Sequence, residues 1–147
     1  MKNFRNAILF NSAILAILIS SCSPSSNIKD NIVGKYASTS ENNYDYFKDT
    51  IEIKSTDDGN FEIQTIANWS AAKKDDPQRP NKNKKAGIWN NYGPGKVSVA
   101  ALQISDTTLR ITEPITGNVR ILYINLHTKT IFEPLGDGDK SIYHKIL

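Results

Sequence analysis

The chain has 147 residues, of which 39% are apolar and 22% charged, and its formal net charge is +3. This length suits one domain of ordinary size, and the composition excludes a disordered chain and a membrane-embedded one. Beyond residues 1–21, 16 basic residues face 15 acidic ones, so the charge does not indicate a nucleic-acid partner.

The amino terminus is typical of a cleavable secretory signal. Lys2 and Arg5 precede an apolar run of 13 residues, Ala7–Ile19. A helix that spans a bilayer needs about 20 apolar residues, so this run is too short to remain as a membrane span. The basic start, the short apolar run and the small residues after it predict a signal peptide over residues 1–21.

The only cysteine of the chain comes next. Ile19-Ser20-Ser21-Cys22 resembles the lipobox of bacterial lipoproteins, in which an aliphatic residue and two small residues precede a cysteine. The resemblance implies cleavage between Ser21 and Cys22, a diacylglycerol on the Cys22 sulfur and an acyl chain such as palmitate on the new amino terminus. A cysteine thiolate is a strong nucleophile near neutral pH, as this modification requires. The acyl chains would anchor the protein by about 0.8 kcal/mol per buried CH₂.

The residue after the cysteine is Ser23 and not aspartate. By the same resemblance this favours the outer membrane of the cell envelope, with the leaflet left open. Serine and proline dominate the next positions, so residues 22–31 are expected to form the lipidated cysteine and a flexible tether. Residues 32–147 are then expected to form a single β domain.

The mature chain alternates apolar and polar residues with a period of two, which is typical of β-strands. In the clearest run, Phe61, Ile63, Thr65, Ala67 and Trp69 are expected to share one face. Turn-forming residues separate the strand candidates, and no segment of ten residues after Cys22 has helical periodicity. The turn candidates are Asp57–Asn60, Gly93–Gly95, Ser105-Asp106, Pro114–Gly117 and Gly136–Asp139. The pattern predicts an all-β fold of eight or nine strands, an antiparallel meander that forms a small barrel or a curled half-barrel.

The most irregular segment is Lys73–Lys85, which holds six basic and two acidic residues. The simpler interpretation is a solvated hairpin loop. The functional interpretation is a mobile basic segment that contacts an anionic lipid, a glycan or a partner protein, with Lys82, Lys84 and Lys85 as candidate contacts.

Three aromatic residues stand near this segment, namely Trp69, Trp89 and Tyr92. Aromatic rings beside a loop can stack on a sugar or line an apolar cavity. They can equally fill the core of a small β domain. Both interpretations stay open from the sequence.

Signatures of catalysis and metal binding are not found in the sequence. Two Asp- and Gly-rich turns lack the oxygen ligands that calcium requires, and His127 and His144 lack zinc-site companions. No phosphate-binding glycine loop or nucleophile motif occurs. We therefore expect no metal, no cofactor and no enzymatic activity, and no nucleic-acid partner in the envelope.

Two further resemblances concern the β domain. Gly34-Lys35-Tyr36 resembles the Gly-x-Trp opening of lipocalin-like barrels, with Tyr in place of Trp. A broader likeness to small envelope lipoproteins of the Bacteroidetes type covers roughly Tyr44–Lys145. It is carried by Asp49-Thr50-Ile51, Phe61-x-Ile63, Gly87-Ile88-Trp89, Leu109-x-Ile111 and Tyr143-His144-Lys145. These likenesses imply a fold and a location but no activity.

Three functions remain in view. The first is a lipid-anchored binding or interaction module whose loops contact an envelope protein or glycan. The second is a carrier that holds a small apolar ligand in a cavity lined by Trp89, Val97, Val99, Leu109 and Tyr123. The third is an inhibitor or immunity-type lipoprotein that blocks an envelope enzyme.

Overall fold

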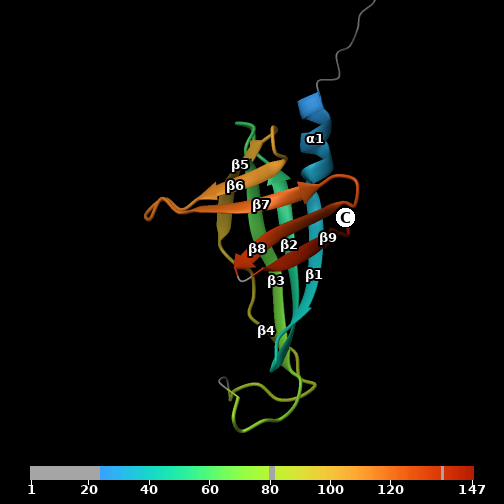
Figure 1. Ribbon diagram of the computed structural model, residues 1–147, viewed down its shortest axis with the longest axis vertical. Helices are drawn as coiled ribbons and strands as arrows, with labels where there is room; N and C mark the ends of the chain where they lie inside the picture. The colour runs from blue at the N-terminus through green and yellow to red at the C-terminus, as the bar shows by residue number, and fades with distance from the viewer. Residues whose placement is uncertain (1–23, 80–81, 137) are drawn as a thin grey trace, which may run out of the picture.

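The computed structural model describes residues 24–79, 82–136 and 138–147 (Figure 1). The predicted signal peptide, its cleavage position at Ser21 and the lipidation site Cys22 lie outside the described residues. One helix precedes nine strands: α1 (Pro24–Ile32), β1 (Gly34–Glu41), β2 (Asp45–Ser55), β3 (Phe61–Ala72), β4 (Asn90–Asn91), β5 (Val97–Gln103), β6 (Thr108–Thr112), β7 (Val119–Asn125), β8 (Thr130–Gly136) and β9 (Asp139–Lys145).

Eight of these strands form a closed antiparallel barrel. Each strand pairs with the next one in the order β1, β2, β3, β5, β6, β7, β8 and β9. The ring is closed because β9 also pairs with β1. The predicted all-β barrel is confirmed, and it is closed. Closure pairs each strand of the barrel on both sides over at least part of its length, which protects a small β domain from unwanted strand pairing.

The first three strands are longer than the barrel requires. β2 and β3 have 11 and 12 residues, whereas β6 has five. β5 pairs with β3 only at Phe61–Gln64, and β9 pairs with β1 only at Tyr36 and Ala37. The remaining halves of β1, β2 and β3 project from the barrel with β4 and the loop after β3 (Figure 1). We call this projection the arm and define it as residues 38–49, 68–79 and 82–92.

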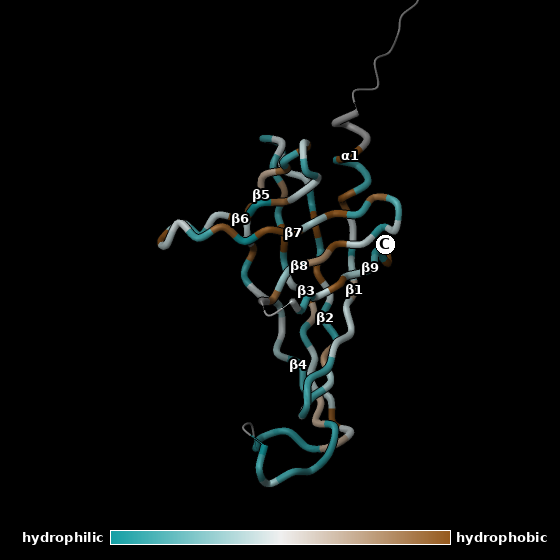
Figure 2. Tube along the Cα trace, in the orientation of Figure 1, coloured by the Kyte–Doolittle hydropathy of each residue, from teal (hydrophilic) through white to brown (hydrophobic). Residues whose placement is uncertain are grey.

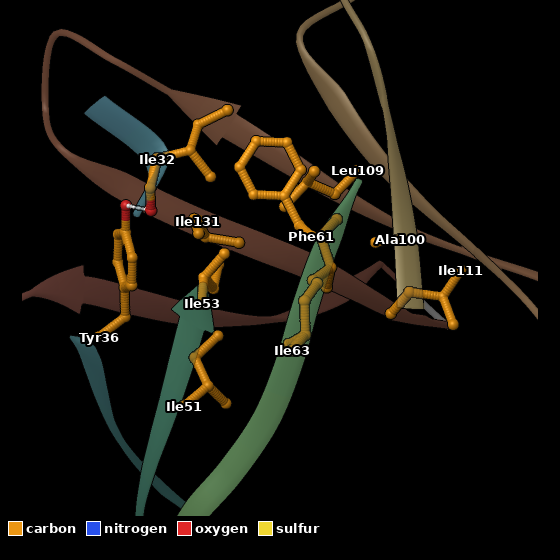
Figure 3. Packing of buried hydrophobic residues seen from close by; sticks show 11 residues of the cluster. Ile32, Tyr36, Ile51, Ile53, Phe61, Ile63, Ala100, Leu109, Ile111 and Ile131 are labelled. Carbon is orange, nitrogen blue, oxygen red and sulfur yellow. Dashed lines mark hydrogen bonds between the residues drawn. The ribbon is translucent and has the colours of Figure 1, made fainter. Parts of the chain in front are cut away.

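The interior of the barrel is filled by apolar side chains (Figure 3). They come from nearly every strand, because alternate residues of a strand point to the same face. Ile32 enters from α1, and the Tyr36 hydroxyl donates a hydrogen bond of 2.7 Å to the carbonyl oxygen of Ile32. Burial raises the pKa of Tyr36 to about 12. The buried cluster consists of Ile32, Tyr36, Ile51, Ile53, Phe61, Ile63, Ala100, Leu109, Ile111, Leu122 and Ile131.

Helix α1 occupies most of the segment for which a flexible tether was expected. Ile28 and Ile32 lie one helical turn apart and both contact the core, Ile32 as a fully buried side chain. The helix has nine residues, which is shorter than the ten-residue window in which helical periodicity was sought. The described part of the tether is therefore helical and ends on the barrel.

Gly34 and Tyr36 belong to the Gly-x-Tyr motif that resembles the start of lipocalin-like barrels. Both have a structural role where the barrel closes. Gly34 has a φ of +141°, and a Cβ atom there would overlap the carbonyl oxygen of Leu147. That oxygen accepts a hydrogen bond of 2.8 Å from the amide of Lys35. A residue without a side chain is required because β1 and the carboxyl terminus approach so closely.

A β-bulge in β3 corrects one prediction. Ile51 pairs with Thr65, but its neighbour Thr50 pairs with Ala67, so Ile66 is an extra residue in β3. An extra residue reverses the alternation beyond it. Phe61 and Ile63 do share the inner face, but the prediction that Ala67 and Trp69 lie on that face is wrong.

Candidate functional site

The barrel interior leaves little space for a ligand. The recess lined by Ile51, Ile63 and Leu122 has a volume of about 30 Å³. That volume holds a water molecule or two, but an organic ligand needs a pocket of roughly 300 Å³ or more. The cavity lining expected for a carrier is also wrong at Val97 and Val99, which are exposed on the outer face of β5.

Polar groups surround this small recess. Arg120 forms a two-bond ion pair with Glu133, with 2.8 Å between Nη2 and Oε2. Burial raises the pKa of Asp49, whose Oδ1 is buried without a hydrogen-bond partner among the described residues. Burial and then the carboxylates of Asp49 and Glu133 raise the pKa of Tyr143. Arg120, Glu133 and Tyr143 line the recess, which has no room for a substrate.

Residues 24–79, 82–136 and 138–147 contain no group of three or more His, Cys, Asp or Glu side chains placed to hold a metal ion. Within the same ranges, no helix has the length and apolar character needed to cross a bilayer.

The arm contains a buried ionic cluster on the face that continues the barrel interior. Asp45 accepts hydrogen bonds from Arg79 Nη2 and from Lys84 Nζ, the latter at 2.9 Å. Lys84 Nζ also donates to the Ser70 hydroxyl at 2.6 Å. The exposed fractions of the Arg79, Lys84 and Asp45 side chains are 3%, 8% and 10%. The basic loop of the arm, residues 73–79 and 82–85, is therefore attached to β2 and β3 through these side chains.

The protonation of Asp45 follows from its two partners. Burial acts to raise its pKa, but hydrogen bonds and charge from Lys84 and Arg79 outweigh burial and lower the pKa below the ordinary aspartate value. Asp45 is therefore a carboxylate at neutral pH.

Lys82 and Lys85 lie near this cluster but remain exposed. Together with Arg79 and Lys84 they line an open recess of about 410 Å³ in the loop. Figure 2 shows this loop as the most continuously hydrophilic part of the molecule. Of the three lysines expected to contact a partner, Lys84 is thus engaged inside the protein, and the other two are free to meet one.

The opposite face of the arm carries aromatic residues. Lys48 Nζ lies 4.3 Å from the ring centroid of Trp89, and Lys73 Nζ lies 5.1 Å from that of Tyr46. Tyr46 and Trp89 line an open groove of about 350 Å³. Trp69 lies on the same face and is 37% exposed.

The structure thus places the predicted aromatic contacts around one arm. Trp69 and Trp89 lie on its outer face. Tyr92 is exposed near the buried ionic cluster, with its ring centroid 5.6 Å from Lys84 Nζ. Gly87–Tyr92 forms a strand only at Asn90 and Asn91. Asp45 and Arg79 were not among the predicted contact residues. Arg79 does lie in the basic segment Lys73–Lys85, and Asp45 is an aspartate at the start of a strand.

No protein-family model, curated protein or solved structure matches this chain. A function has to rest on its own side chains, since fold alone does not imply function.

Proposed function

We propose that this chain is a lipid-anchored, non-catalytic lipoprotein of the bacterial outer membrane whose β-barrel presents the arm to an envelope partner. The anchor is the predicted acyl modification of Cys22. The β domain is the binding module, in which the arm provides the contact surface and the filled barrel supports it.

The observation that carries this proposal is the placement of the arm relative to the start of the described chain. Helix α1 lies at one end of the long axis, and the basic loop of the arm lies at the other (Figure 1). Cys22 precedes Pro24, the first residue of α1, by two positions. An anchor on Cys22 would thus hold the α1 end at the membrane and direct the arm away from it.

The surface of the arm supports a role in binding. Exposed aromatic rings beside cationic side chains are typical of the energetically dominant residues of protein interfaces. Trp69, Tyr46 and Lys48 provide such a surface on the outer face of the arm. The carrier function has less support, because the recess inside the barrel is so small.

The anchor is tested by mass spectrometry of the protein purified from its own cells. The expected result is a mature chain that starts at Cys22 and carries the mass of two or three acyl chains, and a Cys22→Ser variant that is released from membranes. An unmodified cysteine in a membrane-free protein would contradict the anchor.

The arm is tested by lysine acetylation in intact envelopes and in the purified protein. A partner on the arm would shield Lys48 and Lys82 in envelopes and leave Lys54 and Lys140, which are exposed on the barrel, equally reactive in both samples. Equal reactivity of all four lysines in both samples would argue against a partner on the arm.

A further inference from the structure

The buried ionic cluster of the arm, formed by Asp45, Arg79 and Lys84, has an excess of positive charge. Its one carboxylate, Asp45, faces two cations, Arg79 and Lys84, all with side chains at most 10% exposed. Buried charges are normally paired, because each one costs several kcal/mol of desolvation. The cluster therefore has a deficit of one negative charge.

Arg79 shows where this deficit lies. A guanidinium has five N–H donors, and Asp45 engages only Nη2. The Nε and Nη1 atoms are buried and have no hydrogen-bond partner among the described residues. A buried donor left without an acceptor is costly, more so when it is charged. An acceptor from outside the chain would remove that cost.

The recess next to Arg79 is cationic in balance. Lys82, Lys84 and Lys85 line it together with Arg79. The lining also includes Asp75 and Asp76, and both are engaged within the loop. Asp75 Oδ1 accepts from the amide of Ala86 at 2.9 Å, and Asp76 Oδ1 accepts from the amide of Gln78 at 2.8 Å.

Lys74 further neutralises the rim of the recess, because its Nζ lies 3.6 Å from Asp76 Oδ2. Including Lys74 and Asp45, five cations and three carboxylates surround or underlie the recess. A ligand with an opposite charge and several acceptor oxygens fits this combination better than a neutral one.

We propose that the recess binds a phosphate group, with Arg79 as its buried donor and Lys82 and Lys85 as its exposed cations. Phosphate carries more than one negative charge near neutral pH and offers three or more acceptor oxygens. Arginine is well suited to it because its donors are fixed in a plane. The inference deepens the proposed function, since it names the chemistry that the arm recognises.

The test is a titration of the full chain as cells produce it, in an uncharged detergent, with inorganic phosphate at constant ionic strength. The signals are the Arg79 Nε–H resonance and the backbone amides of the loop. We expect a saturable shift with phosphate and none with chloride. Lys82→Ser/Lys85→Ser should weaken the apparent affinity at least tenfold, and Lys54→Ser/Lys140→Ser, a matched loss of two barrel charges, should leave it unchanged.

A second variant keeps the result interpretable if the loop is disturbed. Arg79→Lys retains a cation for Asp45 but removes the fork of donors, and it should weaken phosphate at least tenfold. The amide of Lys73, which bonds to Tyr44 O at 2.8 Å, reports whether the arm remains folded. A response to inorganic phosphate no different from that to chloride, together with no saturable response to a phospholipid headgroup, would overturn the proposal. An unchanged affinity in both arm variants would also overturn it.

The source of the phosphate is separated by a parallel titration. Phosphatidylglycerol is added to the same micelles in place of inorganic phosphate. Saturation with inorganic phosphate supports a free or glycan-borne group, and saturation with the lipid alone supports a headgroup. Because neither titration depends on acylation at Cys22, a negative result here leaves the anchor and the aromatic face of the arm untouched.

Discussion

Removal of the carboxylate at the centre of the arm tests how the loop is held. Asp45→Asn keeps the size of the side chain but leaves Arg79 and Lys84 as two buried cations without their counter-charge. Breaking a buried pair from one side costs about 3–5 kcal/mol, because the partner charge stays buried. Full screening by solvent does not apply, since these side chains are at most 10% exposed.

The cost should appear as opening of the arm and not as unfolding of the barrel. The cluster lies outside the filled interior, so the barrel contacts are unaffected. A local cost of about 3 kcal/mol corresponds to an increase of roughly 10²-fold in the opening equilibrium, at 1.36 kcal/mol per factor of ten. Amide hydrogen exchange measures it at Lys73 and at Tyr92, whose amide bonds to Asn68 O at 2.9 Å.

The matched control is Asp106→Asn. Asp106 pairs with Arg110 at 2.7 Å, but both side chains are more than 40% exposed, so this substitution should leave exchange in the arm unchanged.

Acid should increase amide exchange in the arm as Asp45→Asn does. The pKa of Asp45 is lowered in the folded protein, so its stabilisation is present above the ordinary aspartate pKa and is lost as the pH falls below about 4. Unchanged exchange in Asp45→Asn would refute the assignment of the cluster as the attachment of the loop.

Three predictions concern the barrel. Tyr36→Phe should lower the free energy of unfolding by about 1 kcal/mol through the lost hydrogen bond to Ile32. It should also remove a loss of stability between pH 10 and 12 in urea melts, because the unfolded tyrosine ionises near 10 and the folded one at about 12. Gly34→Ala should lower the melting temperature more than Gly117→Ala, since both have a positive φ but only Gly34 faces the backbone of Leu147. Leu109→Ala should cost about 2–5 kcal/mol, because the side chain is fully buried.

The barrel was predictable because its signals are local. Asp57–Asn60 lies between β2 and β3, and Ser105-Asp106 lies between β5 and β6, as the turn residues indicated. Alternation along each strand then specified antiparallel neighbours. The choice between a closed barrel and a curled half-barrel was not predictable in this way, because closure depends on the pairing of β1 with β9, which are far apart in the sequence.

The arm was less predictable because its contacts join distant positions. Asp45 and Arg79 are 34 positions apart, and nothing in the local pattern pairs them. The extra residue Ile66 has no turn signal, yet it reverses the faces of β3 and moves Trp69 outward. Val97 and Val99 could face either side of their strand by composition, and only packing around Ala100 decides it.

The most direct test of the central claim, that the arm is the contact surface, is site-specific photocrosslinking in the cells that produce the protein. A photoreactive residue replaces Ile88, which is exposed in the arm, or Ile115, which is 98% exposed in the turn between β6 and β7. Both are exposed isoleucines and Ile115 is the more exposed of the two, so non-specific capture should be no weaker at position 115. The account predicts a defined crosslinked product from position 88 and none from position 115. A product from position 115 alone, or equal products from both, would contradict it.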